Sequence, residues 1–303
     1  MDYVGILVQA AKMLWKHKVI YVFFLVMYAI PSLLALGGMG VFVSMIDMSN
    51  PSNLFGMNGD LINFKTPFAW SLAGAYFLFM LLTYSCYIIG SVGVMKGISL
   101  VDSNAESFGF VSLLQDSLKY FWPVAAIFFV IGVVFIIIMI PALVLGPMVF
   151  LIFLFLIPIF LFGRTLVELL MAAIVNGDLG LRAALESVWQ MIQRQLWPLV
   201  LITILLLVVE FAANTIVSIP IGVVQQVAMF ALFPRLAAQD SSQMFGEMFK
   251  WMFVIMIFVM PVMLVVQGLV TSFHLSATSL FYLNLTRKLV QPAPMADMVP
   301  VDA

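Results

Sequence analysis

The sequence predicts an all-α fold: a polytopic membrane helix bundle of about six transmembrane helices in three hairpins, each preceded by a cytoplasmic amphipathic helix. Composition is the first reason, because 64% of the residues are hydrophobic and 9% are charged, against roughly 45–50% and 25% in soluble domains. The second is a series of apolar runs long enough to cross the ~30 Å hydrocarbon layer. The third is a pattern, used three times, in which an amphipathic stretch ends in a basic residue before an apolar run.

The three passages with this pattern are KMLWKHKVIYVFFL (12–25), LLQDSLKYFWPVAAIFF (113–129) and VWQMIQRQLWPLVLITI (188–204). When Trp122-Pro123 is aligned with Trp197-Pro198, Gln115 also matches Gln190 and Lys119 matches Arg194. Lys16 precedes the first apolar run in the same way. We therefore expect one integral membrane domain over residues 1–290, built of modules at about 1–100, 101–177 and 178–290, and a short flexible C-terminal tail at 291–303.

The first four predicted spans come from three apolar runs. The first run is 19–46, interrupted by Pro31, and the second is 67–97. The third, 122–163, holds 42 residues without a charge and would be about 63 Å long as one straight helix. It is therefore expected to fold back at Pro141 and Gly146-Pro147, because proline breaks the helical ladder and glycine relaxes a turn.

The remaining helix boundaries follow from turn residues. The fourth helix is expected to continue through Arg164 to Asn176-Gly177, and the fifth to run from Trp197 to about Ile219, where Pro220 ends it. The sixth lies within 250–286, which is too long for one straight span. A kinked or re-entrant element near Pro261 is preferred to a seventh crossing.

The distribution of basic residues agrees with six crossings and two cytoplasmic termini. Ten cations then lie inside: Lys12, Lys16, Lys18, Lys96, Lys119, Arg164, Arg182, Arg194, Arg287 and Lys288. Three lie outside: Lys65, Arg235 and Lys250. This asymmetry satisfies the positive-inside rule, and a seventh crossing would spoil it by moving Arg287 and Lys288 outside.

The segments before the three modules are predicted to be helices in the plane of the membrane. In 2–18 the apolar residues at helical spacing are Val4, Leu7, Val8, Ala11, Leu14 and Trp15. The second segment is expected to start at Ser103-x-x-Glu106, a capping-box pattern, and the third near Asp178, with Arg182 and Glu186 one turn apart. These helices either cover the cytoplasmic mouth of the bundle or bind lipid headgroups or a partner.

Residues 162–208, FGRTLVELLMAAIVNGDLGLRAALESVWQMIQRQLWPLVLITILLLV, resemble the core of a bacterial membrane-domain family related to the membrane portion of glycerophosphodiester phosphodiesterases. The resembling features are Arg164, the Ala183–Trp189 helix and the Trp197 start of the fifth span. The passage SATSLFYLNLTRK (276–288) is similar to the closing segment of that family. Two departures are Asn176-Gly177-Asp178, where an acidic residue is expected to open the loop, and the lack of an attached phosphodiesterase domain. The resemblance implies a fold and a membrane setting, and no hydrolase activity.

The sequence offers few residues for chemistry. It has one cysteine, Cys86, and two histidines, His17 and His274, so we expect no disulfide framework, no thiolate metal site and no nucleophile–base pair. Motifs for serine hydrolases, zinc proteases, phosphate loops and dinucleotide binding are absent. The net charge of −1 offers no basic field for nucleic acid. We therefore expect no enzyme activity, no cofactor and no resident metal.

One candidate site is a polar layer in the middle of the membrane. Glu210 lies 13 residues after Trp197, which places it about 20 Å deep, and an acid there should face protein or water or be protonated. Asn214 is one turn away, and His274 and Tyr84 fall at a similar depth when counted from Arg287 and Lys96. This layer could relay protons or bind a polar headgroup, and the alternative is an interhelical hydrogen bond that fixes helix register.

Three further patterns each have a plain structural alternative. Methionines recur every fourth residue from Met244 to Met260, but this row spirals around the helix and favours adaptable packing over a copper site. Gly93-x-x-x-Gly97 allows close helix packing within the chain or in a dimer. Arg164 and Glu168, one turn apart, either form structural pairs or bind a phosphate headgroup. The candidate headgroup or interfacial contacts are Arg164, Glu168, Lys119, Arg194, Trp122 and Trp197.

These observations predict a multi-pass protein of the cytoplasmic (inner) membrane without catalytic chemistry. Its expected role is an accessory or structural subunit that binds membrane lipids, another membrane protein complex or a second copy of itself. The alternative is a transporter or lipid-moving protein with a polar site around Glu210, and a third hypothesis is a lipid-modifying enzyme that depends on Arg164 or Glu168.

Overall fold

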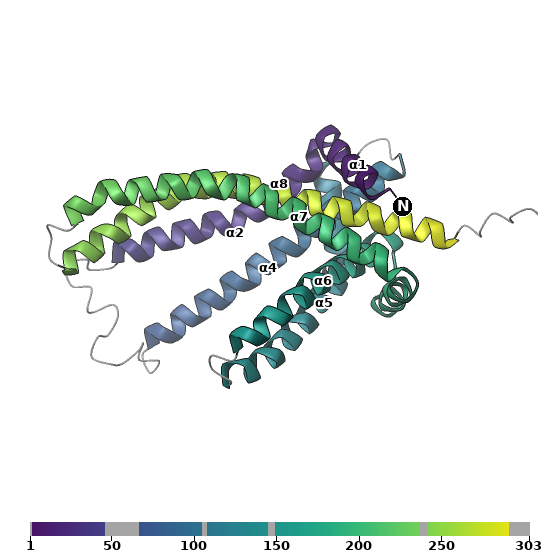
Figure 1. Ribbon diagram of the computed structural model, residues 1–303, viewed down its shortest axis with the longest axis horizontal. Coiled ribbons are helices and arrows are strands. Elements are labelled where there is room, and N and C mark those ends of the chain that lie inside the picture. The colour runs from purple at the N-terminus through teal and green to yellow at the C-terminus, as the bar shows by residue number, and fades with distance from the viewer. Residues whose placement is uncertain (1, 46–66, 105–107, 145–148, 237–240, 291–303) are drawn as a thin grey trace, which may run out of the picture. The chain divides into compact units, whose positions relative to one another are not determined.

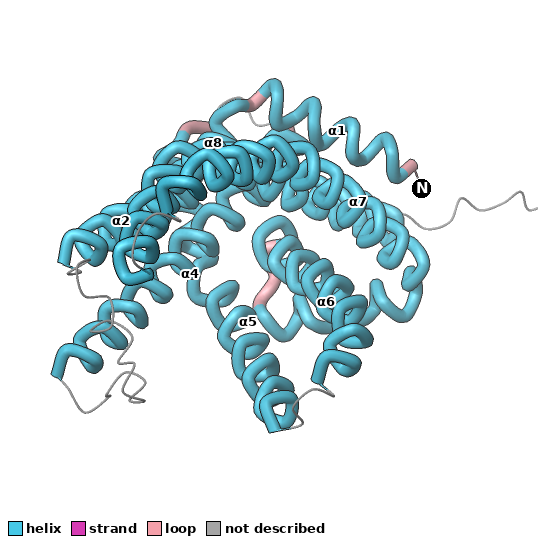
Figure 2. The backbone as a smooth tube through the Cα atoms, turned by 60° about the vertical axis from the view of Figure 1, so that its left-hand side comes forward, coloured by secondary structure: helices cyan, strands magenta, loops and turns pink. Residues whose placement is uncertain are grey.

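The computed structural model describes residues 2–45, 67–104, 108–144, 149–236 and 241–290, and these residues form helices joined by turns, with no strand among them (Figures 1 and 2). The helices are α1 (Tyr3–Lys16), α2 (Lys18–Met45), α4 (Pro67–Asp102), α5 (Phe110–Val144), α6 (Val149–Gly177), α7 (Leu181–Leu236) and α8 (Ser241–Val290). The predicted all-α fold is therefore confirmed.

Six of the described helices are long and apolar enough to cross a membrane, which confirms the predicted number of spans. The candidate spans are Lys18–Gly38, Gly74–Asp102, Phe110–Val134, Phe160–Gly177, Leu181–Val224 and Ile257–Arg287. Many large apolar side chains on these helices are exposed, including Phe129, Ile137, Phe211 and Phe258. So much exposed apolar surface is unfavourable in water and suits contact with lipid. The protein is a multi-pass membrane protein.

Prolines do not end the helices at the predicted places. α5 continues through Pro141 but ends at Val144 and packs against α6, which begins at Val149, so the predicted fold-back of this run is confirmed; Gly146-Pro147 lies outside the described residues. α7 continues through Pro220 to Leu236, so the predicted end of the fifth span near Ile219 is wrong. α8 is one helix from Ser241 to Val290 that contains Pro261, without a re-entrant break. Proline removes one hydrogen bond of the ladder, and neighbouring groups in a membrane helix can compensate for that loss.

The three amphipathic segments join their spans in three different ways. α1 is a separate helix, because the chain leaves the helical conformation at His17 before α2 begins. The second segment is continuous with α5, which begins at Phe110, so the predicted start at Ser103 is wrong. There the Ser112 hydroxyl accepts a hydrogen bond from the N–H of Gly109. The third segment joins its span within α7 across a kink at Gln195 (φ −139°, ψ 43°).

Of the apolar residues predicted at helical spacing along α1, Leu14 alone is buried. Asp2 caps the helix by accepting a hydrogen bond from the N–H of Gly5 at 2.8 Å. Ile6, Ala10 and Leu14 are buried, whereas the predicted apolar residues Val4, Val8 and Trp15 are exposed. The helix therefore has apolar residues on two faces. One packs on the protein, and the other suits the lipid interface.

The chain forms two compact units that cut across the three sequence modules. Unit 1 comprises the described residues within Met1–Ile20, Ser91–Leu207 and Ser272–Ala303, and unit 2 those within Tyr21–Gly90 and Val208–Thr271. In unit 1, α5 and α6 pack as a hairpin and lie side by side in both views (Figures 1 and 2). The core of unit 1 contains Met95, Leu169, Ile174 and Phe281, all almost fully buried.

Glycines on α4 permit close contact with α2 inside the chain. A Cβ built on Gly97 would lie 3.0 Å from Ile20 Cγ1, and one on Gly90 would lie 2.9 Å from Phe24 Cδ2. The glycine of the predicted Gly93-x-x-x-Gly97 pattern at position 97 thus has an intramolecular packing role. Small residues commonly serve this purpose where membrane helices approach closely.

Replacement of Gly90 by alanine tests this packing. We expect Gly90→Ala to lower the free energy of unfolding by about 1–3 kcal/mol, because the added methyl group meets the buried Phe24 ring. The measurement is the thermal unfolding midpoint in mild detergent. Gly132→Ala on α5 is the matched control, since nothing lies within 4 Å of its added Cβ, and its midpoint should not fall. Equal midpoints for the two variants would contradict the packing contact.

Candidate functional site

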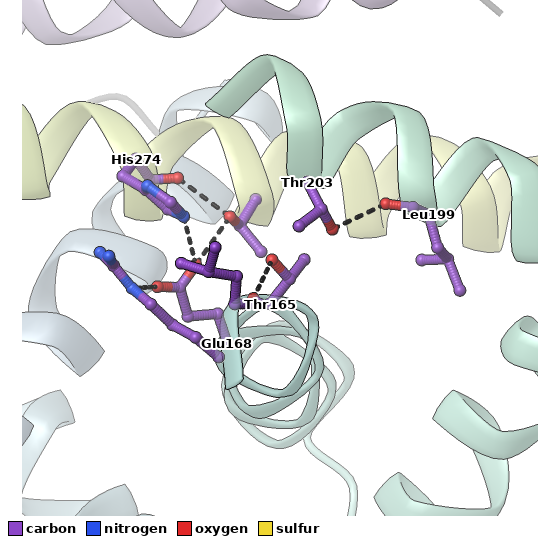
Figure 3. Close-up of polar contacts among 8 residues, drawn as sticks. Thr165, Glu168, Leu199, Thr203 and His274 are labelled. Atoms are coloured by element: carbon purple, nitrogen blue, oxygen red, sulfur yellow. Dashed lines mark hydrogen bonds and ion pairs between the residues drawn. The ribbon is translucent and has the colours of Figure 1, made fainter. Parts of the chain in front are cut away.

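The most deeply buried charge among the described residues of unit 1 is the carboxylate of Glu168 on α6. Its side chain is 4% exposed and contacts three residues from two helices. Oε1 accepts a hydrogen bond from Arg164 Nε at 3.1 Å. Oε2 lies 2.9 Å from His274 Nε2 and 3.1 Å from the hydroxyl of Thr278, both on α8. We call these four residues the Glu168 cluster, and Figure 3 shows Glu168 directed from α6 towards His274.

The local geometry of each helix places these side chains together. Arg164 and Glu168 are one turn apart on α6, and His274 and Thr278 are one turn apart on α8, so each pair lies on one helix face. The Thr278 hydroxyl lies 3.0 Å from the carbonyl of His274 and 3.1 Å from Glu168, so it shares one proton between two acceptors. The cluster therefore joins two one-turn pairs across two helices.

The electrostatics of the cluster depend on its half-buried arginine. An isolated carboxylate is expensive to bury, and paired charges with additional hydrogen bonds reduce that cost. Arg164 is 38% exposed, so its guanidinium can remain in contact with solvent or headgroups while its Nε holds Glu168. The contacts of Glu168 with His274 and Thr278 link α6 to α8 and fix the register of the two helices.

Other hydroxyls near the cluster are bonded within their own helices. Thr165 donates to the carbonyl of Leu161 at 3.4 Å, and Thr203 donates to the carbonyl of Leu199 at 2.8 Å (Figure 3). Donation to the carbonyl four residues earlier satisfies a buried hydroxyl without a tertiary partner. These threonines therefore belong to the surroundings of the cluster and not to its charge network.

A buried polar stretch of α8 extends the contacts of the cluster to α4. Ser272, Ser276, Thr278 and Ser279 are all buried. Asn176 Nδ2 on α6 donates to the Ser279 hydroxyl at 2.7 Å, and that hydroxyl lies 3.5 Å from the carbonyl of Met95 on α4. Small polar residues at these positions allow three helices to approach closely and to exchange hydrogen bonds.

A second group, which we call the interfacial charge cluster, lies where α6 ends. Asp178 adopts a left-handed conformation (φ 49°) just after Gly177, as a residue following a helix often does. Its carboxylate accepts a hydrogen bond from the Tyr120 hydroxyl at 2.7 Å and lies 3.4 Å from Lys119 Nζ. Lys96 and Lys119 Nζ lie 5.7 Å and 4.9 Å from the centre of the Tyr120 ring. The hydrogen bond from Tyr120 and the neighbouring Lys119 charge lower the pKa of Asp178.

The predicted candidate residues fall into three settings. His274 and Glu168 meet in the Glu168 cluster. Asn214 lies in unit 2, where its Oδ1 accepts a hydrogen bond from Gln267 Nε2 at 2.9 Å. Glu210 lies on the same helix and is half-buried, and Tyr84 on α4 is 52% exposed. The predicted midplane layer of these residues stays a prediction, whereas the contact of His274 with Glu168 is a finding.

Of the six predicted headgroup or interfacial residues, four are exposed, whereas Arg164 is half-buried and Glu168 is buried, so the prediction of an interfacial contact for Glu168 is wrong. Trp122 and Trp197 are 78% and 75% exposed, and Trp15 at the matching place of the first module is 79% exposed. Lys119 and Arg194 are exposed, and Arg164 is half-buried. Lys18 Nζ lies 5.8 Å from the centre of the Trp15 ring. Each of the three modules thus presents a tryptophan and a basic residue together on the surface of unit 1.

Sequence reasoning did not identify the pairing of Glu168 with His274 and Thr278. One signal was present: Arg164 and Glu168 on α6, and His274 and Thr278 on α8, are pairs of polar residues at a spacing of four within predicted spans. That spacing indicates a polar face but does not identify which helix the face contacts.

The described residues contain no group of three or more histidine, cysteine, aspartate or glutamate side chains that could hold a metal ion. Comparisons with protein-family models, characterised proteins and solved structures give no match to this chain. The resemblance to the phosphodiesterase-related membrane family therefore stays a prediction.

The buried position of Glu168 predicts a large effect on stability. We expect Glu168→Gln to lower the free energy of unfolding by at least about 2 kcal/mol, because Arg164 and His274 lose the carboxylate between them. Glu186→Gln is a matched control. Glu186 contacts Arg182 at the same spacing and the same 3.1 Å distance, but the two side chains are 63% and 94% exposed, so a change below about 1 kcal/mol is expected. Thermal unfolding in detergent measures both, and equal effects would refute a special role for burial.

The lowered pKa of Asp178 predicts a pH dependence. A carboxyl group with a lower pKa in the folded state contributes stability above its ordinary value of 3.8 and loses it as the pH falls through the folded-state value. Asp178→Asn keeps a residue that tolerates the left-handed conformation and removes the charge. The unfolding midpoint of the wild type should exceed that of the variant at pH 6, and the difference should shrink as the pH falls below 3.8. A pH-independent difference would contradict the proposed contact.

Proposed function

We propose that this protein is a non-catalytic multi-pass protein of the cytoplasmic membrane that binds anionic lipid headgroups through unit 1 and serves as an accessory or structural subunit. The observation that carries the proposal is the repeated pairing of an exposed tryptophan with a basic residue. Trp15, Trp122 and Trp197 are 75–79% exposed, and Lys16, Lys119 and Arg194 lie within three residues of them and are also exposed. Tryptophan rings prefer the membrane interface, and nearby cations attract anionic headgroups.

The distribution of charge supports an orientation for this arrangement. All ten cations predicted on the cytoplasmic side belong to unit 1, and Arg235 and Lys250, predicted on the other side, belong to unit 2. Unit 1 includes the C-terminal end of α4, the whole of α5 and α6, the N-terminal part of α7 and the C-terminal part of α8. We infer that the helix ends of unit 1 that carry these cations lie on the cytoplasmic side.

The polar groups of unit 1 support a structural role more than a catalytic one. Both oxygens of Glu168 are engaged by side chains of the same chain, and Asp178 and Asp102 contact Tyr120 and Arg287, respectively. A carboxylate that already accepts several bonds needs to lose them before it can act on a substrate. These contacts are suited to holding helices in place beneath a lipid-binding surface.

The second candidate function is a transporter or lipid-moving protein with a polar site around Glu210. The hydrogen bond from Gln267 to Asn214, one turn from Glu210, favours it, because it joins polar residues of α7 and α8 within predicted spans. A carrier requires water access to Glu210, and Glu210→Gln should abolish its flux without unfolding it. An accessory subunit should tolerate that change and co-purify with another membrane protein.

Titration with phosphatidylglycerol and with phosphatidylcholine tests the proposed lipid binding. The variant Lys16→Gln/Lys119→Gln/Arg194→Gln should bind phosphatidylglycerol roughly 100-fold more weakly than the wild type, because each interfacial cation contributes about 1 kcal/mol. The measurement is lipid binding by native mass spectrometry, with the unfolding midpoint as a check of folding. Arg182→Gln is the control, because Arg182 is also exposed but has no tryptophan within three residues. Equal affinity of the wild type for the two lipids would refute the proposal.

A further inference from the structure

The interfacial charge cluster of unit 1 contains two lysines and one carboxylate, so it has one positive charge in excess. On α5, Lys119 Nζ lies 3.4 Å from the Asp178 carboxylate and 3.3 Å from the Tyr120 hydroxyl. On α4, Lys96 Nζ lies 5.7 Å from the centre of the Tyr120 ring. Two ammonium groups from different helices therefore converge on one tyrosine.

Lys96 is the cation of this cluster that has no carboxylate partner of its own. It is half-buried, and its neighbours Met95 and Gly97 on α4 are buried. Among the described residues its ammonium forms no ion pair, and it lies over the Tyr120 ring instead. A ring attracts a cation less strongly than a full negative charge does, and a cation that is partly removed from water gains from an anion. The position of Lys96 therefore favours an anion from outside the chain.

Asp178 shows which groups of the cluster bind an oxyanion. Its carboxylate accepts a hydrogen bond from the Tyr120 hydroxyl at 2.7 Å. That bond lowers the pKa of Asp178, and the charges of Lys119 and, less strongly, Lys96 lower it further. The same types of donor bind carboxylate and phosphate oxygens. The Asp178 side chain is 69% exposed, so a second anion can reach the cluster beside it.

The surroundings of the cluster favour a phospholipid as the source of this anion. Trp122, two residues after Tyr120, is 78% exposed, and exposed tryptophans prefer the depth of the headgroups. The phosphodiester of phosphatidylglycerol carries one negative charge, which balances the one excess cation of the cluster. Inorganic phosphate carries a larger charge near neutral pH and has no acyl chains to hold it at that depth.

We propose that the interfacial charge cluster is a binding site for the phosphate group of an anionic phospholipid, in which Lys96 and Lys119 hold the phosphate oxygens and Asp178 competes with them for Lys119. This inference rests on the proposed function, because it identifies one place on unit 1 where a headgroup binds. It adds a cation, Lys96, and a limiting role for Asp178, and neither residue belongs to the tryptophan–cation pairs.

Removal of the Lys96 charge tests the site. We expect Lys96→Gln to weaken binding of phosphatidylglycerol roughly 30-fold, because a hydrogen bond between charged groups is lost. Lys18→Gln is the matched control, since Lys18 Nζ also lies over a ring, 5.8 Å from the centre of Trp15, but both residues are exposed. It should weaken binding about fivefold, as expected for one exposed interfacial cation. Native mass spectrometry in mild detergent measures the affinities, and thermal unfolding checks that both variants fold.

Removal of the Asp178 charge tests the same site in the opposite direction. In Asp178→Asn the competing carboxylate is gone, so phosphatidylglycerol should bind about fivefold more tightly. Glu186→Gln is the control, because it makes the same change of charge at an exposed pair outside the cluster, and it should change the affinity by less than about twofold. A cluster that only holds the end of α6 in place would gain no affinity in Asp178→Asn.

The outcomes separate this site from the proposed function. If the wild type prefers phosphatidylglycerol to phosphatidylcholine but Lys96→Gln has no larger effect than Lys18→Gln, or Asp178→Asn binds no more tightly, the site is refuted and the proposed function stands. Equal binding of the two lipids by the wild type refutes both. Inorganic phosphate is the remaining probe, and if it binds more tightly than phosphatidylglycerol and loses its binding in Lys96→Gln, the assignment to a lipid is overturned.

Discussion

Burial of the Glu168 carboxylate is the constraint on which the arrangement of unit 1 depends. A buried charge without partners is costly, so the structure must keep Arg164, His274 and Thr278 within reach of it. Two of these partners lie on α8, and they hold that helix at one register against α6. The hydrogen bond from Asn176 to Ser279 lies farther along the same two helices and reinforces the register.

The contacts between helices in unit 1 are partly polar, whereas the exposed residues of α5 that follow Trp122 are apolar. In unit 1, the buried stretch of α8 places serines, threonines and a histidine against α4 and α6. On α5, by contrast, Phe129 and Ile137 are exposed and apolar, as expected for residues that face lipid. Hydrocarbon provides little drive to bring apolar helices together, so hydrogen bonds and close packing must specify which helices meet. The polar stretch of α8 supplies both.

Because α7 does not end at Pro220, its polar residues on both sides of this proline belong to one helix. Because the helix continues through Pro220, Asn214, Ser218, Gly222 and Gln226 lie on one continuous element. If the helix ended at Pro220, Gly222 and Gln226 would lie in a loop, and a spacing of four residues would not place them on a common face. As parts of one helix, these four residues share one helix face. The Asn214 contact with Gln267 shows that polar residues of this region already bind across helices.

The sequence by itself determined the class, the number of spans and the exposure of the interfacial tryptophans. Hydrophobicity over about 20 residues is a local property, so the six spans could be predicted, as could the exposed positions of Trp122 and Trp197. The end of α6 at Asn176-Gly177 was predictable for the same reason. Local propensity was misleading at Pro220, because a helix in a membrane can keep its course where a loop would be expected in water. The tertiary structure alone decided that Glu168 meets His274, 106 residues later, since each polar face was visible in the sequence and its partner depended on how distant helices pack.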